Sequence, residues 1–141
     1  MAEKHIRLED RILREFRNIA VVGLSTSPER PSYRIASYLA GQSYNIIPVN
    51  PSAPEIMGRK SYPDLSSIPE KVDVVQVFRR AEDAMPIVEE AIKIGAKAVW
   101  LQEGIVNEEA AARGRGAGLL VVMDKCMLTE HRRLIQGQLA R

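Results

Sequence analysis

The residues with the most distinctive chemistry follow the first apolar segment of the chain, residues 19–22 (IAVV). Gly23 ends this segment and permits a tight turn and the close approach of a ligand. Arg30 adds a guanidinium whose planar fork suits phosphate oxygens. A helix starting just after it would aim unpaired N–H groups and its positive dipole end at the same place. Hydroxyl donors lie between them, on Ser25, Thr26 and Ser27.

This order predicts that a phosphorylated ligand binds at the end of the first strand. A plainer interpretation stays open. The hydroxyls of Ser25 and Ser27 can satisfy the backbone of the turn, and Arg30 can be a solvated loop charge.

The elements that must position this loop alternate between strand and helix. Apolar runs predict strands over residues 19–22, 44–50, 72–78, 98–101 and 119–123. Helical spacing and end signals predict helices over residues 8–16, 33–40, 82–94, 107–117 and 129–139. Residues 51–63 are expected to form an irregular connection that can include a short turn before Gly58. The pattern predicts an α/β fold with a doubly wound parallel sheet of about five strands and helices on both faces.

We expect one domain over residues 1–141, with residues 1–17 providing an N-terminal helix that packs on it. Ligands of such sheets bind beyond the carboxyl ends of the strands, where the strand order switches. The loops after the first four strands should therefore meet at the site. They comprise residues 24–32, Asn50 onward, Arg79–Arg80 and 102–104.

Composition narrows the function classes. The formal charge of the 141-residue chain is +2 and its basic residues are dispersed, so a nucleic-acid partner is not indicated. No apolar run approaches the roughly 20 residues of a membrane helix, and the charged start does not resemble a secretory signal. Cys126 is the only cysteine, which excludes an intrachain disulfide and makes the cytoplasm the default location.

The phosphorylated ligand is not expected to be NAD. A dinucleotide fingerprint needs Gly-x-Gly-x-x-Gly and a later acidic residue for the ribose, whereas this chain has Gly23 alone and ends its second strand with Asn50 and Pro51. A ligand with an additional ribose phosphate, such as NADP or coenzyme A (CoA), remains compatible. Arg59 and Lys60 are candidates for that phosphate, or charges of a solvated loop.

Several segments, in order and spacing, resemble the small stand-alone CoA-binding proteins, a family related to the CoA-binding domain of the succinyl-CoA synthetase α subunit. They are residues 21–25 (VVGLS), 29–33 (ERPSY), 47–51 (IPVNP), 58–63 (GRKSYP), 77–80 (VFRR), 95–102 (GAKAVWLQ) and 122–126 (VMDKC). The likeness runs from about residue 8 to about residue 135. It implies a Rossmann-like fold with CoA or an acyl-CoA at the carboxyl ends of the strands.

The resemblance also implies roles for individual residues. The pyrophosphate would be surrounded by Gly23, Ser25, Ser27, Arg30, Pro31, Ser32 and Tyr33. Asn50 and Pro51 would flank the adenosine. The adenine or the start of the pantetheine arm would be bordered by Phe78, Arg79 and Arg80. The path of that arm would be lined by Trp100, Gln102 and Gly104.

Some of these positions have structural alternatives. Phe78 and Trp100 are often core residues, and Trp100 continues a buried strand. Asn50 can simply cap the turn before Pro51. Arg79 and Arg80 open a helix, where cations are unfavourable, so they either bind the ligand or pair with Glu82 or Asp83.

Cys126 is the one candidate for covalent chemistry. If a helix begins within residues 127–130, Cys126 lies at its N-terminus, where the thiolate is favoured and could form a mixed disulfide with CoA. The alternative is a small buried side chain at a strand end. His131 follows on the same helix, and no paired carboxylates or Cys/His metal pattern accompany them, so we expect no catalytic or metal-binding residues.

The sequence thus predicts a CoA-binding, CoA-sensing or CoA-carrying protein without catalysis. The phosphorylatable histidine of the synthetase lies in a second domain for which this chain has no room, so the ligase reaction is not transferred. One alternative is a small NADP-linked or Cys126 thiol-dependent enzyme. Another is an interaction module with a vestigial nucleotide site. The chain could also form a homo-oligomer, or be a module of a larger complex that uses the last helix as a docking face.

Overall fold

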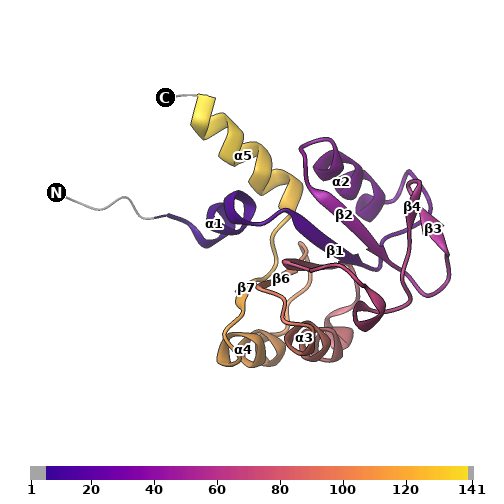
Figure 1. The fold of residues 1–141 in the computed structure, drawn as a ribbon. Coiled ribbons are helices and arrows are strands. Elements are labelled where there is room, and N and C mark those ends of the chain that lie inside the picture. The colour runs from indigo at the N-terminus through magenta and orange to yellow at the C-terminus, as the bar shows by residue number, and fades with distance from the viewer. Residues whose placement is uncertain (1–5, 140–141) are drawn as a thin grey trace.

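Five short strands form one parallel sheet in this computed structural model, which describes residues 6–139 (Figure 1). Their order across the sheet is β2-β1-β5-β6-β7, and neighbouring strands pair in parallel throughout. The strands are β1 Asn18–Val22, β2 Asn45–Val49, β5 Val74–Val77, β6 Ala98–Leu101 and β7 Leu120–Val122. The helices are α1 Leu8–Glu15, α2 Pro31–Ala40, α3 Ala84–Lys93, α4 Glu108–Gly116 and α5 Met127–Leu139.

Helices cover both faces of the sheet because its strands are apolar on both sides. In Figure 1, α1, α2 and α5 lie on one face and α3 and α4 on the other. Two buried clusters correspond to these layers. One joins α1, α2 and α5 to Ile19, Val21 and Trp100, and the other joins α3 and α4 to Ala20 and Val75. The structure is therefore a Rossmann-like, doubly wound α/β domain, as predicted.

Helix starts and strand ends differ from the prediction in detail. Helix α2 begins at Pro31 rather than residue 33, because proline fits the first helical position. Helix α5 begins at Met127 rather than residue 129. A 3-10 turn, Ala81–Asp83, precedes α3, which starts at Ala84 rather than residue 82. The predicted strands over 44–50, 72–78 and 119–123 are each shorter at both ends.

The predicted irregular connection over 51–63 contains a small antiparallel hairpin, which corrects that expectation. Its strands are β3 Glu55–Ile56 and β4 Arg59–Lys60. Met57 and Gly58 make the turn, both with positive φ. A two-residue turn of this kind matches the twist of a hairpin, but two-residue strands carry too little alternation to be read from sequence.

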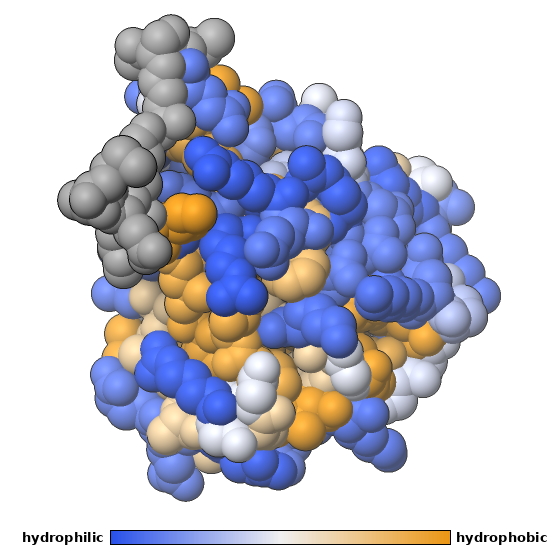
Figure 2. All heavy atoms as spheres, turned by 60° about the vertical axis from the view of Figure 1, so that its left-hand side comes forward, coloured by the Kyte–Doolittle hydropathy of each residue, from blue (hydrophilic) through white to orange (hydrophobic). Residues whose placement is uncertain are grey.

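The helix α1 packs against the sheet layer that also carries α2 and α5. Ile12 and Leu13 of α1 are buried, and the hydroxyl of Tyr44 donates to the carbonyl of Leu13 at 2.6 Å. Residues 1–5 and 140–141 of the predicted domain lie outside the described residues. Figure 2 shows the side of the molecule that carries α1, where an apolar area lies among charged side chains. Over residues 6–139, no helix combines the length and the apolar character that a bilayer crossing requires.

Candidate functional site

The sheet order switches between β1 and β5, and two backbone segments touch there. Consecutive strands lie on opposite sides of β1, so their loops diverge and leave an opening beyond the carboxyl ends. Gly23 follows β1 with a φ of 88°, and a Cβ atom placed on it would lie 2.6 Å from the carbonyl oxygen of Phe78. The N–H of Phe78 donates to the carbonyl of Val22 at 2.9 Å. Glycine is required here both by conformation and by space.

The loop after Gly23 is closed by its own hydroxyls. The Oγ of Ser32 accepts a hydrogen bond from the N–H of Ser25, and the Oγ of Ser25 accepts one from the N–H of Ser27, both at 3.0 Å. The turn-satisfying role of Ser25 is thus present. Each hydroxyl keeps its own O–H for donation, because these bonds use only its lone pairs. The loop is therefore built to hold its shape while offering donors.

A cavity of about 390 Å³ opens over this loop. Its lining residues are Gly23, Ser25, Ser27, Arg30, Pro31, Ser32 and Phe78. Ser32 and Tyr33 lie in the first turn of α2, where backbone N–H groups have no partner within a helix. Arg30 is exposed at the N-cap, and none of the ion pairs among the described residues involves it. Hydroxyl donors, a guanidinium without an ion pair and the positive end of a helix therefore lie around one hollow, a combination that favours negative charge.

A second hollow of about 440 Å³ continues from Gly23 between the loops after β2 and β5. It is lined by Gly23, Asn50, Pro51, Ser52, Phe78, Arg79, Arg80 and Asp83. The Nδ2 of Asn50 donates to the carbonyl of Leu24 at 3.0 Å, and its Oδ1 accepts from the N–H of Ser52 at 2.8 Å. Asn50 thus caps the turn and ties the second loop to the first.

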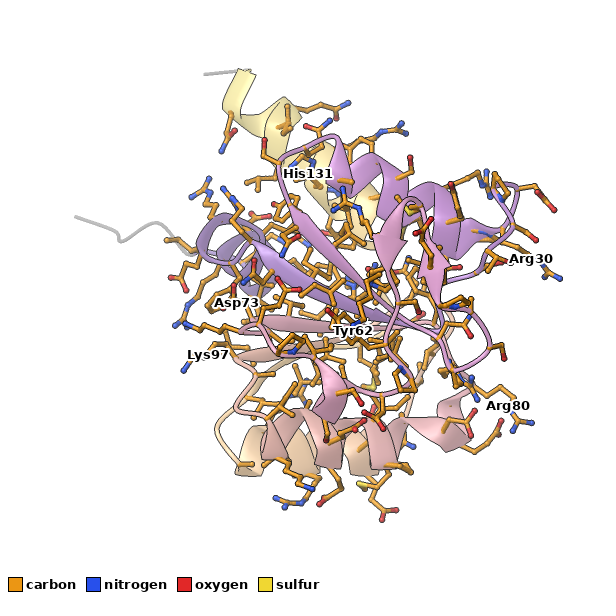
Figure 3. The ribbon with its side chains drawn as sticks, turned by 45° about the vertical axis from the view of Figure 1, so that its right-hand side comes forward. Arg30, Tyr62, Asp73, Arg80, Lys97 and His131 are labelled. Atoms are coloured by element: carbon orange, nitrogen blue, oxygen red, sulfur yellow. The ribbon has the colours of Figure 1, made fainter. Side chains whose placement is uncertain are left out.

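Arg79 and Arg80 form the ion pairs that sequence reasoning left as the alternative to ligand binding. Arg79 lies 3.7 Å from the carboxylate of Asp83, and Arg80 lies 3.2 Å from Glu82 and 3.4 Å from Asp83. Both arginines remain accessible, with side chains 49% and 76% exposed. An exposed pair of this kind contributes little stability, so both guanidinium groups can rearrange toward an anion at small cost. In Figure 3, Arg30 and Arg80 lie at the same edge of the sheet, opposite Asp73 and Lys97.

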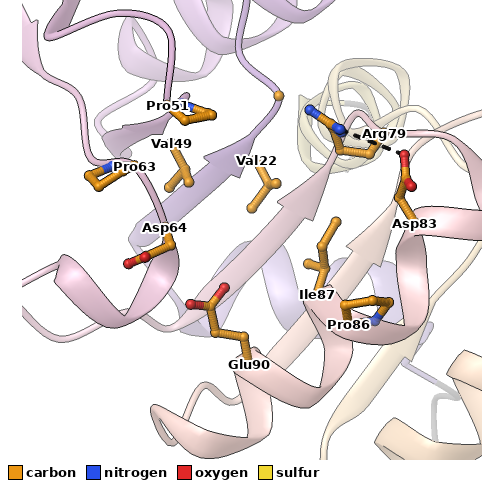
Figure 4. Close-up of a pocket in the computed structure, with 11 residues that line it drawn as sticks. Val22, Val49, Pro51, Pro63, Asp64, Arg79, Asp83, Pro86, Ile87 and Glu90 are labelled. Carbon is orange, nitrogen blue, oxygen red and sulfur yellow. Dashed lines mark ion pairs between the residues drawn. The ribbon is translucent and has the colours of Figure 1, made fainter.

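A third cavity of about 280 Å³ lies between β2 and α3, and Gly23 also lines it (Figure 4). Its walls are mostly apolar side chains and proline rings, with three carboxylates and one arginine among them: Val22, Gly23, Val49, Pro51, Pro63, Asp64, Arg79, Asp83, Pro86, Ile87 and Glu90. Glu90 accepts hydrogen bonds from the N–H and hydroxyl of Ser66 at 3.1 and 3.0 Å. A flat apolar group with polar edges fits such walls.

A fourth cavity of about 550 Å³ extends from Phe78 toward the N-terminus of α5. It is lined by Pro31, Ile35, Phe78, Arg79, Arg80, Gln102, Glu103, Ile105 and Cys126. Cys126 is partly buried. Phe78 and Arg79 line this cavity as well as the second hollow, so the two share a border. The four hollows share lining residues and adjoin one another at the carboxyl ends of the strands, which we call the carboxyl edge of the sheet.

Most of the predicted site residues lie together around these hollows, and a few do not. Thr26 is exposed and lines none of these hollows. Tyr33 is half-buried against the core. Gly104 donates its N–H to Asp124 at 2.7 Å and shapes the loop after β6 with a φ of 87°. Trp100 is fully buried, with its indole N–H donating to the carbonyl of Lys125 at 2.8 Å, so it is a core residue and not part of a ligand path.

Arg59 and Lys60, the candidates for an additional phosphate, lie on β4 and line none of the hollows. Sequence reasoning missed the contribution of α3, which supplies Pro86, Ile87 and Glu90 to the third cavity. The available signal was topological. The helix after β5 must pack beside the switch point, but which of its residues face the opening depends on the 3-10 turn before it.

A buried polar group connects the two helices whose first turns flank the site. The Nδ1 of His131 on α5 and the hydroxyl of Tyr38 on α2 are 2.8 Å apart. His131 is 6% exposed, and its ring also meets Tyr44 edge-on. Burial, and secondarily the charge of Arg17, lowers the pKa of His131 below its ordinary 6.5.

Comparison with known proteins gives a uniform result. A profile of the CoA binding domain matches residues 17–132. The YneT protein of Bacillus subtilis is 40% identical over 120 residues, which cover 85% of this chain and 89% of YneT. A solved structure of a hypothetical protein from Pyrococcus horikoshii OT3 has a TM-score of 0.88 at 41% identity, covering 96% of this chain and 99% of the other.

A much longer enzyme carries a related segment. Acetate–CoA ligase (ADP-forming) II of Archaeoglobus fulgidus is 28% identical over 95 residues, which are 66% of this chain and 14% of that enzyme. The profile match covers most of the chain, including all five strands of the sheet. This chain therefore belongs to the CoA-binding domain family.

Proposed function

We propose that this protein binds CoA or an acyl-CoA along the carboxyl edge of its sheet, with the pyrophosphate in the hollow over the Gly23–Tyr33 loop. The observation that carries this proposal is the convergence of the α2 first turn, two serine hydroxyls and the unpaired Arg30 on one hollow. Family membership supports CoA as the ligand. The acetate–CoA ligase relative has CoA in its name, which agrees with that choice.

The adjoining hollows suit the remaining parts of CoA. The third cavity has apolar walls for the adenine ring, and the carboxylates of Asp64 and Glu90 at its border can accept hydrogen bonds from an exocyclic amine. The second hollow lies next to it and presents Arg79 and Arg80, of which we assign the more exposed Arg80 to the ribose phosphate. The fourth cavity, toward Gln102 and Cys126, would take the pantetheine arm.

We propose a binding role rather than catalysis. Three of the carboxylates that line the hollows are engaged with neighbours: Asp83 with the two arginines, Glu90 with Ser66, and Asp64 with Ser67 at 2.9 Å. The fourth, Glu103, is exposed at the fourth cavity, where no nucleophile–base pair accompanies it among the described residues. His131 bonds Tyr38 within the core instead of facing these hollows. A chain that holds CoA in this way could store it, deliver it or report its level. That the chain forms a homo-oligomer or binds a protein partner remains a prediction from the sequence.

Isothermal titration calorimetry on nucleotide-free protein tests this function. CoA, acetyl-CoA, dephospho-CoA, NAD and NADP are titrated under identical reducing conditions. We expect CoA to bind in the micromolar range and NAD not to bind. Tighter binding of NADP than of CoA would instead indicate a reductase site, and no binding of any of these ligands would indicate a vestigial site.

A further inference from the structure

The fourth cavity brings the single thiol of the chain together with a buried amide. Cys126 immediately precedes α5, and its carbonyl accepts the N–H of Glu130 at 2.9 Å, so it opens that helix. Gln102 follows β6 and is 5% exposed, yet it lines the same cavity as Cys126. The cavity volume of about 550 Å³ lies in the range of sites that hold small molecules.

The orientation of the Gln102 amide shows what this cavity offers. Its Oε1 accepts from the backbone N–H of Met127 at 3.4 Å and from the Nε2 of Gln76 at 3.2 Å. A backbone N–H can only donate, so the oxygen of Gln102 faces inward. No acceptor among residues 6–139 takes the Nε2 hydrogens of Gln102. Gln102 lines the cavity, and its Nε2 is not among the sealed polar atoms without a partner, so this amide offers an open donor to an acceptor that enters the cavity.

A pantetheine arm supplies that acceptor and a sulfur together. Its amide carbonyls can accept from Gln102, and its terminal sulfur follows the last amide by a short ethylene link. Ile35, Phe78 and Ile105 give the cavity an apolar wall suited to the methylene groups. Cys126 lines the same space, so a sulfur atom at the end of the arm would come to the thiol of Cys126.

We propose that Cys126 reacts with CoA disulfide to form a protein–CoA mixed disulfide within this cavity. The inference rests on the proposed CoA site. The Cys126 thiol loses its proton to solvent, and its sulfur attacks the sulfur of the CoA half held in the site. The new S–S bond forms as the S–S bond of CoA disulfide breaks. The second CoA leaves as a thiolate and takes a proton from solvent. The site thereby records the redox state of the CoA pool.

Intact-mass spectrometry on the full-length, reduced and nucleotide-free protein tests this step. Adduct formation is followed over time with CoA disulfide and, in parallel, with oxidised glutathione, which lacks the adenosine and pyrophosphate. We expect one CoA to add, the rate to saturate with CoA disulfide concentration, and a reductant to reverse the adduct. The rate with CoA disulfide should exceed that with oxidised glutathione by about tenfold or more at equal concentration.

A substitution in the proposed pyrophosphate hollow, far from Cys126, tests whether the reaction depends on recognition of CoA. Arg30→Ala should lower the ratio of the two rates about tenfold, because it weakens only the ligand that carries a pyrophosphate. Arg34→Ala, within α2 and outside the hollows, is the matched control and should leave the ratio unchanged. Equal rates with the two disulfides, or an unchanged ratio in Arg30→Ala, would overturn the proposal.

Calorimetry under reducing conditions separates this proposal from the proposed function. If the reduced protein binds CoA but forms no selective adduct, the mixed disulfide is excluded and the CoA site stands. If the reduced protein does not bind CoA, both proposals fail.

Discussion

Gly23 and Phe78 meet so closely that a single methyl group on Gly23 would overlap the Phe78 carbonyl, at 2.6 Å. This contact joins the end of β1 to the end of β5, the two strands between which the sheet order switches. All of the hollows along this edge, except the one toward Cys126, include Gly23 in their lining. The geometry of the whole site therefore depends on this contact.

Replacing Gly23 by alanine should destabilise the protein and abolish CoA binding. The positive φ alone costs about 1 kcal/mol for a residue with a Cβ atom, and the overlap with the Phe78 carbonyl adds about 1–3 kcal/mol. Urea unfolding measures the loss. Gly118→Ala is the matched control, because Gly118 has a φ of 93° and no neighbour within 4 Å of a built Cβ. Equal losses for the two variants would show that the Phe78 contact carries no cost.

Arg80 should bind the ribose phosphate of CoA and so distinguish CoA from dephospho-CoA. In wild-type protein we expect dephospho-CoA to bind about tenfold more weakly than CoA, since a charge-assisted hydrogen bond to phosphate is lost. In Arg80→Ala the two ligands should bind with nearly equal affinity, as measured by calorimetry. Arg59→Ala is the control, because Arg59 lies on β4 away from the hollows. If Arg59→Ala and not Arg80→Ala removes the discrimination, the phosphate lies near the hairpin instead.

Protonation of His131 should weaken the fold. Burial lowers the pKa of His131 in the folded protein below 6.5, its ordinary value, so between these two pKa values the unfolded chain binds more protons than the folded one. Stability is therefore full above about pH 6.5 and declines as the pH falls toward the lowered pKa. Urea midpoints at about pH 8 and about pH 5.5 measure this decline.

His131→Asn separates His131 from the carboxylates that also titrate in acid. Asparagine can still meet the Tyr38 hydroxyl but gains no charge. The midpoint of this variant should fall less between the two pH values than that of wild type. An identical fall in both proteins would mean that His131 does not contribute to the acid dependence.

Much of the architecture could be predicted from the sequence, because a doubly covered parallel sheet has a strong signature. Apolar runs such as Val74–Val77 must be buried on both faces, and helical segments between them leave little choice of fold. Gln76 breaks that run and is nonetheless fully buried, where it bonds Gln102 at 3.2 Å. Hydropathy alone does not predict that a glutamine at this position is buried.

The position of the site at the carboxyl ends of the strands could be predicted, but the residues that line its cavities could not. Loop residues such as Ser25 and Arg30 follow directly from strand ends, so topology alone places them at the switch point. Ile87 and Glu90 line the third cavity because of the angle and register at which α3 begins. That register is set by packing after the short 3-10 turn, which local sequence does not specify. Trp100 is the opposite case. It lies close to Gln102 in the sequence, yet its side chain is fully buried in the core.

Arg30 offers the most direct test of whether CoA binds with its pyrophosphate on the loop after β1. The CoA dissociation constants of wild-type protein, Arg30→Ala and Arg34→Ala would be compared by calorimetry, with urea unfolding to verify that all three fold equally. Loss of one charged hydrogen-bonding group should weaken CoA about tenfold in Arg30→Ala, and Arg34→Ala should bind like wild type. Equal CoA affinity in all three proteins would contradict this placement of the pyrophosphate.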